Sequence, residues 1–327
     1  MYSIFLGGVN ADSPESPGNS LSFSTRLKNL GFLSVTNPLE AQFAICVDNE
    51  KDFQMNINRA RISKERSIIV RNEPVVVCPE NKLSRTGRRY GLSLDMGRPP
   101  SKSENSIPWP QQWPTKMINF ETNSSRHERI ALVNGNKISF IPGELYSLRR
   151  EAIMTIKSLD LYGTSWDLSS ESKIRHALSN LVIAIKGGYF PRISGARYYF
   201  KRFPSWKGSP FDKRRVLFNY KYCLVIENST EFMTEKLFDA FFSGCIPIYV
   251  GPELEEFPIP ANLYFQAKPN LKSIKESLTE ASKIDYKAWH IELCKWLNLD
   301  STKKYWSADE VNTRVIKAIN KYCNKII

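Results

Sequence analysis

The chain lacks long apolar runs, histidine clusters and paired cysteine motifs. No apolar stretch approaches the roughly 20 residues that a membrane helix needs, so we expect the chain to contact a bilayer at most. Its six cysteines have no spacing typical of zinc or redox sites, and its three histidines lie far apart. Residues 1–17 show no cationic segment followed by a long apolar one. The sequence therefore predicts no secretory signal, a cytoplasmic location and reduced, buried thiols.

The composition that is present is that of an ordinary folded protein. The chain has 327 residues, which at roughly 150 residues per domain predicts about two domains. Hydrophobic residues make up 42% and charged residues 24% of the chain. These values exclude a disulfide-stabilised miniature scaffold, a fibre and a disordered chain.

Basic residues are in excess. The chain has 46 Lys and Arg against 33 Asp and Glu, which leaves a net charge of +13 and favours anionic partners. Residues 186–215 concentrate this charge and interleave it with aromatic side chains. The simplest interpretation is a solvated loop. The same pattern is also typical of a single-stranded nucleic-acid platform or of a membrane-surface patch.

The first third alternates short apolar runs with polar segments. We expect strands at residues 2–6, 42–47, 67–70 and 75–78, and helices at 21–32 and 56–66. This alternation predicts parallel βαβ units in an α/β domain over residues 1–125. The end of that domain, residues 95–126, is rich in proline and predicts a connection between domains.

A second α/β pattern follows. We expect strands at 129–135, 159–163, 221–229 and 245–251, and helices at 145–159 and 234–244. Thr234 is placed to cap the last helix and Gly244 to end it. The pattern predicts a second domain over residues 126–290 and a helical tail over 291–327. One face of the helices in this region carries an apolar stripe of Trp289, Leu293, Trp296 and Leu297, which we interpret as core packing.

Polar residues follow the predicted strand 221–229. Ligands of open parallel sheets bind outside the carboxyl ends of the strands, where Glu227 and Asn228 stand. Lys236 could pair with a bound anion, and Glu235 could accept hydrogen bonds from the two hydroxyls of a ribose. Alone, such an acid and lysine are more often solvated surface.

The block KYCLVIENSTEFMTEKLFDAFFSGCIPIYVGP, residues 221–252, is more specific. It resembles the donor-binding signature of the α-1,3/4-fucosyltransferases, glycosyltransferase family 10. The segments RIALVNGNK, LYSLRREAI, LDLYG and WKGSPFDKRRVLFNYKY extend the resemblance upstream, whereas the first third resembles the family only thinly. The resemblance implies a GT-B fold, with two Rossmann-like domains facing a central cleft. It also implies inverting transfer of fucose from GDP-fucose to a glycan hydroxyl.

The resemblance implies the donor-binding residues. Lys236 would pair with the diphosphate, Glu235 would hold the ribose, and Asn228 would lie against the nucleotide sugar. Phe232 stands where several family members have tyrosine, so it keeps a stacking face and loses a hydroxyl.

Arg149 resembles the family's arginine that neutralises the departing diphosphate. An arginine suits this task because its planar fork of donors matches phosphate oxygens. The adjacent Arg150 leaves the choice between the two open.

The catalytic base is expected in the first domain. Glu73 follows a predicted strand and resembles the family's strand-then-glutamate segment, with Glu80 as the second candidate. We expect no metal site and no required cofactor, because GT-B enzymes generally need no essential metal and the chain has no Asp-x-Asp motif. Stimulation by a divalent cation stays open.

The preferred hypothesis is a cytoplasmic fucosyltransferase that uses GDP-fucose and a glycan acceptor, of a lipid-linked or lipopolysaccharide type. It predicts peripheral contact with the anionic inner face of a membrane and no nucleic-acid partner. Three alternatives remain: the same fold with another nucleotide-sugar donor, a basic nucleic-acid-binding protein, and a catalytically inactive glycan-binding relative.

Overall fold

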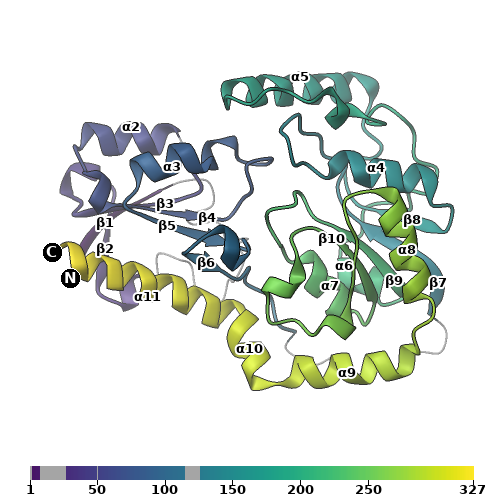
Figure 1. Ribbon diagram of the computed structural model, residues 1–327. Coiled ribbons are helices and arrows are strands. Elements are labelled where there is room, and N and C mark those ends of the chain that lie inside the picture. Colours follow the sequence, from purple (N-terminus) through teal and green to yellow (C-terminus); the bar gives the residue numbers. More distant parts are fainter. Residues whose placement is uncertain (1, 8–26, 50, 115–125) are drawn as a thin grey trace. The chain divides into compact units, whose positions relative to one another are not determined.

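The computed structural model describes residues 2–7, 27–49, 51–114 and 126–327 (Figure 1). The chain divides into two compact units. The first contains residues 1–113 and 300–327, and the second contains residues 114–299. The second unit is thus inserted into the chain of the first.

The first unit contains a six-stranded parallel sheet in the order β2-β1-β3-β4-β5-β6. Its strands are β1 (Tyr2–Gly7), β2 (Phe32–Val35), β3 (Phe43–Val47), β4 (Ser67–Arg71), β5 (Leu92–Met96) and β6 (Ser106–Ile107). Strands β3 and β4 are buried along their whole length. Their near-continuous apolar sequences are typical of parallel strands covered on both faces.

Helices cover both faces of this sheet. The helices of this unit are α2 (Lys51–Arg59), α3 (Leu83–Arg89), α10 (Asp300–Trp306) and α11 (Ala308–Ile326), and its 3-10 turns are η1 (Pro38–Glu40), η2 (Lys64–Arg66), η3 (Pro79–Asn81) and η4 (Pro100–Lys102). Figure 1 shows α11 running along the sheet, and its Val311, Val315 and Ile319 join the core on that side. Phe53 and Ile57 of α2 join a second core cluster.

Several local predictions for this unit differ from the structure. Residues 75–78 form a turn, because the amides of Val77 and Cys78 both donate to the carbonyl of Pro74. The predicted helix 56–66 begins earlier, as α2, and ends at Arg59. The predicted helix 21–32 lies partly outside the described residues, and β2 begins at its last residue, Phe32.

The C-terminal residues and the proline-rich segment also differ from expectation. Residues 300–327, predicted as part of a separate tail, belong to the first unit. This follows from the apolar face of α11, which is buried in that unit's core. The proline-rich segment 95–126 contributes β6 to the first sheet, and its residues 115–125 lie outside the described part of the chain.

The second unit contains a five-stranded parallel sheet in the order β11-β10-β9-β7-β8. Its strands are β7 (His127–Val133), β8 (Leu159–Tyr162), β9 (Tyr220–Ile226), β10 (Ile246–Val250) and β11 (Phe265–Gln266). Its helices are α4 (Tyr146–Thr155), α5 (Ser170–Lys186), α6 (Lys213–Leu217), α7 (Lys236–Phe242), α8 (Leu271–Ala281) and α9 (Tyr286–Asn298), with η5 (Ile193–Ala196), η6 (Leu254–Glu256) and η7 (Ala261–Leu263). Helix α5 was not among the predicted elements, and η5 and α6 interrupt the predicted basic loop.

Helix α7 lies at the centre of the second unit. Its six residues from Leu237 to Phe242 are buried. The ring of Trp296 from α9 lies 5.9 Å from that of Phe238 and 5.6 Å from that of Phe241. The predicted apolar stripe of α9 is therefore core packing. Gly244, with φ of 67°, ends α7 as predicted, because the left-handed region favours glycine.

All six cysteines are free thiols, four of them buried. Among the described residues, no helix is long and apolar enough to cross a membrane.

Candidate functional site

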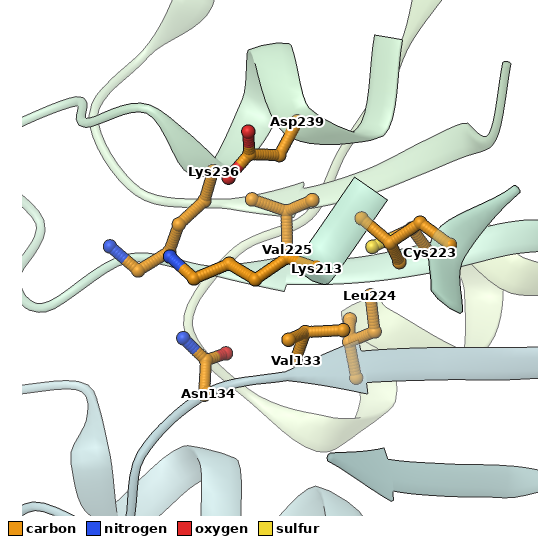
Figure 2. Close-up of a pocket in the computed structure, with 9 residues that line it drawn as sticks. Val133, Asn134, Lys213, Cys223, Leu224, Val225, Lys236 and Asp239 are labelled. Carbon is orange, nitrogen blue, oxygen red and sulfur yellow. The ribbon is translucent and has the colours of Figure 1, made fainter. Parts of the chain in front are cut away.

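A hollow lies at the second sheet, between β7, β9, α6 and α7 (Figure 2). It is lined by Val133, Asn134, Lys213, Leu217, Cys223, Leu224, Val225, Lys236 and Asp239. Figure 2 shows the ammonium groups of Lys213 and Lys236 extending to the same side of the hollow, with the amide of Asn134 nearby. Asn134 directly follows the carboxyl end of β7. Two cations and an amide therefore converge where a parallel sheet places its ligands.

A fully buried carboxylate organises this edge. Glu227 directly follows β9, and its Oε1 accepts the backbone N–H of Thr234 at 2.8 Å. Its Oε2 accepts the hydroxyl of Thr234 at 2.7 Å and the Nζ of Lys236 at 3.2 Å. The predicted cap is therefore wrong, because the Thr234 hydroxyl serves Glu227 and Glu235 occupies the N-cap position of α7. The ammonium group of Lys236 is therefore held by a buried negative charge.

The charges at this edge hold one another ionised. Burial opposes the charged form of Lys236, but the carboxylates of Glu227 and Glu235 outweigh it and raise the pKa of Lys236. Burial likewise opposes the charged form of Glu235, while Lys236 and Lys213 lower the pKa of Glu235 to about 2. The Nζ of Lys213 lies 3.3 Å from Oε1 of Glu235. At neutral pH the edge is thus a chain of alternating charges that presents two ammonium groups.

Two adjacent arginines of α4 have different surroundings. The Nε and Nη2 of Arg149 donate to the carbonyl of Ile226 at 3.1 and 2.8 Å, and Nη2 also donates to Oδ1 of Asn228 at 3.0 Å. These bonds do not use Nη1. The side chain is buried, and desolvation lowers the pKa of Arg149, so its positive charge is held in a weakly solvated place.

Arg150 instead binds three backbone carbonyls of its own unit. Its Nε donates to Arg197 at 2.8 Å, its Nη1 to Lys137 at 2.5 Å, and its Nη2 to Gly195. Burial lowers the pKa of Arg150 to about 10. Arg149 therefore lies at the carboxyl end of β9 beside Asn228, whereas Arg150 ties the segment around η5 to α4.

The predicted donor residues form two groups. Arg149 and Asn228 are hydrogen-bonded to each other, and Glu235 and Lys236 belong to the charged chain around Glu227. Phe232 is buried, at 2% exposure. Sequence reasoning missed Asn134 and Lys213. Asn134 had a usable signal, because it directly follows an apolar strand.

In the first unit, Glu73 lies on a loop held by a buried acid. Oδ1 of Asp48 accepts the backbone N–H groups of Asn72 at 2.7 Å and Glu73 at 2.9 Å. It also accepts Nδ2 of Asn81 at 2.7 Å, and the same Nδ2 donates to the carbonyl of Glu73 at 2.9 Å. The backbone of Glu73 is thus held on both sides by Asp48 and Asn81, which sequence reasoning missed.

The two candidate bases differ in their partners. Glu80 forms an ion pair with Arg85, with 2.7 Å between Oε2 and Nη1. Asp48 follows β3 with φ of 55°, and desolvation raises its pKa despite its hydrogen bonds.

Within the described ranges, no group of three or more His, Cys, Asp and Glu side chains could hold a metal ion.

Comparison with known proteins identifies the fold of this chain. No sequence-family model matches the chain, and no curated protein sequence matches it either. Among solved structures, Anabaena HepE in complex with UDP-glucose superposes with a TM-score of 0.54 at 9% identity, over 98% of this chain and 100% of that one. An α1,3-fucosyltransferase superposes with a TM-score of 0.53 at 13% identity, over 96% of this chain and 89% of that one. An α1,3-fucosyltransferase with GDP-fucose superposes with a TM-score of 0.50 at 12% identity, over 96% of this chain and 90% of that one. The predicted α/β GT-B fold is confirmed.

Proposed function

We propose that this chain is an inverting glycosyltransferase that transfers fucose from GDP-fucose to a hydroxyl of a glycan. The observation that carries the proposal is the convergence of Lys213 and Lys236 on one hollow of the second sheet, with Asn134 beside them. A site of this charge at this edge suits a diphosphate. The GT-B fold, shared with structures that contain UDP-glucose or GDP-fucose, supports it.

The second unit would bind the donor. Lys236, kept charged by Glu227, would pair with the diphosphate, and Glu235 would accept hydrogen bonds from the ribose hydroxyls. As the bond between C1 of the sugar and the diphosphate breaks, negative charge develops on the leaving group. Fixed cations stabilise that charge because they need no reorganisation during the step. Arg149 would add a further cation beside Asn228.

The first unit would supply the base. The acceptor hydroxyl attacks C1, its proton passes to the carboxylate of Glu73, and the diphosphate leaves with the electron pair of the broken bond. A single displacement of this kind inverts the configuration at C1. Asp48 and Asn81 would hold the backbone of Glu73 in place for this proton transfer. In this mechanism the charge-stabilising groups are side chains, and no metal is required.

A second donor class is favoured by one specific observation. The superposition on the HepE complex with UDP-glucose covers the whole of that chain. Its TM-score is 0.54, against 0.53 and 0.50 for the two fucosyltransferase structures. A uridine diphosphate sugar has the same diphosphate, so the same lysines would serve it. The two donors differ in the nucleobase and in the sugar, so binding measurements must distinguish them.

A thermal-shift panel with GDP, GDP-fucose, UDP and UDP-glucose tests the donor. A ligand at about 100 times its Kd stabilises the folded state by about 2.7 kcal/mol, enough for a shift of several degrees. We expect shifts with GDP and GDP-fucose. A shift with the uridine nucleotides alone would transfer the proposal to the second donor, and no shift with any nucleotide would overturn it.

Lys221 provides a matched control for the lysine. It lies near the start of β9, where its Nζ is 3.0 Å from Glu128, so it is also a lysine paired with a glutamate. We expect Lys236→Gln to lose the nucleotide shift and Lys221→Gln to keep it. Equal shifts in both variants would remove Lys236 from the donor site.

Glu73→Gln tests the base. This variant should keep the nucleotide shift, because Glu73 is not a donor residue, and should lose transfer to a glycan by at least roughly a hundredfold. Glu80→Gln is the control and should retain most of the turnover. Near-normal turnover of Glu73→Gln would show that another group removes the proton.

A further inference from the structure

Helix α5 carries an apolar stripe that its own unit does not cover. Ile174, Leu178, Val182 and Ile185 recur every three or four residues, so they share one face of the helix. Their exposure lies between 46% and 59%. The apolar face of a surface helix normally packs on the core. In α5, the buried residues are instead Lys173 and Ala184.

The basic segment after α5 runs back beside the helix. At the end of α5 the amide of Tyr189 donates to the carbonyl of Ala184 at 3.0 Å. Near its start, the Nζ of Lys173 donates to the carbonyl of Lys201 at 3.3 Å. Residues 189–201 therefore return along the length of α5. The guanidinium of Arg150 donates hydrogen bonds to the carbonyls of Gly195 and Arg197 in this segment.

The returning segment, which contacts α5 on the side of Lys173 and Ala184, also carries exposed apolar and cationic groups. Phe190 is 90% exposed, and Ile193 and Phe200 are also exposed. We call the resulting surface the α5 face. It consists of Ile174, Leu178, Val182, Ile185, Phe190, Ile193 and Phe200, together with the exposed cations Arg192, Lys201 and Arg202.

Positive charge gathers in this part of the chain. Residues 170–202, which make up α5 and the returning segment, contain seven Lys and Arg and one acidic residue, a net charge of +6. The cations crowd one another: after burial, the charge of Arg202 is the next cause that lowers the pKa of Lys173. A negative surface laid against this region would relieve that repulsion.

We propose that the α5 face docks on an anionic phospholipid bilayer, with α5 lying parallel to the membrane plane. Aliphatic and aromatic side chains would enter the interface while the cations meet the lipid headgroups. A second copy of the chain is a poorer occupant, because two such positive surfaces repel. A nucleic acid is also a poorer occupant, because the exposed stripe on α5 is aliphatic and offers bases no ring to stack on; only Phe190 and Phe200 of the neighbouring segment do. The proposal does not rest on the glycosyltransferase activity.

Vesicle sedimentation tests it with the full chain. We expect retention by vesicles of phosphatidylcholine with 30% phosphatidylglycerol at low salt, weaker retention at high salt, and little by phosphatidylcholine alone. Leu178→Gln with Ile185→Gln should weaken retention roughly tenfold, since two half-exposed aliphatic side chains lose their place in the interface. The control is Ile291→Gln with Leu299→Gln, which alters two similarly exposed aliphatic residues elsewhere in the second unit. Circular dichroism checks that both variants remain folded.

Each other outcome overturns the proposal. Absence of retention at low salt would do so, as would equal retention of the two double variants. Size-exclusion chromatography showing a dimer that only Leu178→Gln/Ile185→Gln dissociates would identify a second copy as the occupant. A single-stranded oligonucleotide that binds both variants equally, without vesicle binding, would identify a nucleic-acid surface. A thermal midpoint lowered in this variant alone, without vesicle binding, would mean that the stripe is packed within the protein.

Discussion

The two sheets have the same parallel architecture but carry different chemistry at their carboxyl edges. In the second sheet, Glu227 after β9 anchors a lysine inside a network of opposite charges. In the first sheet, Asp48 after β3 binds two backbone amides and one side-chain amide. One buried acid thus fixes a cation, and the other fixes a loop.

This difference shows that strand pattern sets where a site lies and not what it does. A buried carboxylate paired with an ammonium group prepares an edge for an anionic ligand. A buried carboxylate satisfied by amides makes an edge rigid without making it positive.

Lys236→Ala should have the largest effect, because it leaves the fully buried Glu227 without its cation. Breaking a buried ion pair in this way costs about 3–5 kcal/mol of unfolding free energy. Urea denaturation measures the loss. Glu227→Gln added to Lys236→Ala should recover a large part of it, and a double variant no more stable than Lys236→Ala would contradict the pairing as the cause.

The two arginines of α4 should separate structure from binding. Arg150→Met leaves three backbone carbonyls without their donor and should lower the unfolding free energy by about 3 kcal/mol, while the folded variant keeps its nucleotide shift. Arg149→Lys should be milder in denaturation yet lose most of the nucleotide shift. Urea denaturation and nucleotide thermal shifts of both variants test these roles. A nucleotide shift lost in Arg150→Met and kept in Arg149→Lys would assign nucleotide binding to Arg150 and the structural role to Arg149.

Asp48→Asn tests the edge of the first sheet. The pKa of Asp48 is raised above its ordinary 3.8, so the folded state binds this proton more tightly than the unfolded state. The wild-type free energy of unfolding should therefore fall, through this group, as pH rises above about 4. At pH 4.5 the variant should be less stable by about 1 kcal/mol, and this deficit should shrink at pH 7. A deficit that grows with pH would refute this assignment.

Glu235→Gln should have the smallest effect on stability, below about 1 kcal/mol, because the side chain is 39% exposed and its pairing with Lys213 is screened by solvent. Its pKa is lowered to about 2, so its stabilising effect is present above pH 4.5 and is lost as pH falls toward 2. Unfolding at pH 6 and pH 3 should show the wild-type advantage decreasing. Nucleotide affinity should fall severalfold at pH 7 if Glu235 holds the ribose.

The sequence predicted the second sheet better than the first. The block around α7 is long and continuous, so its strands, helix and glycine stop could all be located. Residues 75–78 have strand-like composition, but the carbonyl of Pro74 closes a turn around them. The turn is local, because the bonded residues lie three and four positions apart, and Pro74 was the turn signal that the strand-like composition of the run concealed.

The site was predicted only in part, because several of its residues meet from distant positions in the sequence. Lys236 and Glu235 belong to a contiguous motif, whereas Lys213 reaches Glu235 from 22 positions away. Asp48 and Asn81 are 33 positions apart and meet only through the folded sheet. Helix α5 has a visible apolar period, but its pattern alone does not reveal that the apolar face is uncovered.

The division of the chain has a practical consequence for engineering. The chain leaves the first unit and re-enters it at neighbouring points, because the amide of Gln111 donates to the carbonyl of Trp306 at 2.8 Å and the amide of Ala308 donates to the carbonyl of Gln111 at 3.0 Å. The intervening residues are therefore a cassette with adjacent ends. We expect a short linker between these points to span the excision, and we expect a cassette from another protein with similarly spaced ends to leave the β-strand order of the first sheet unchanged.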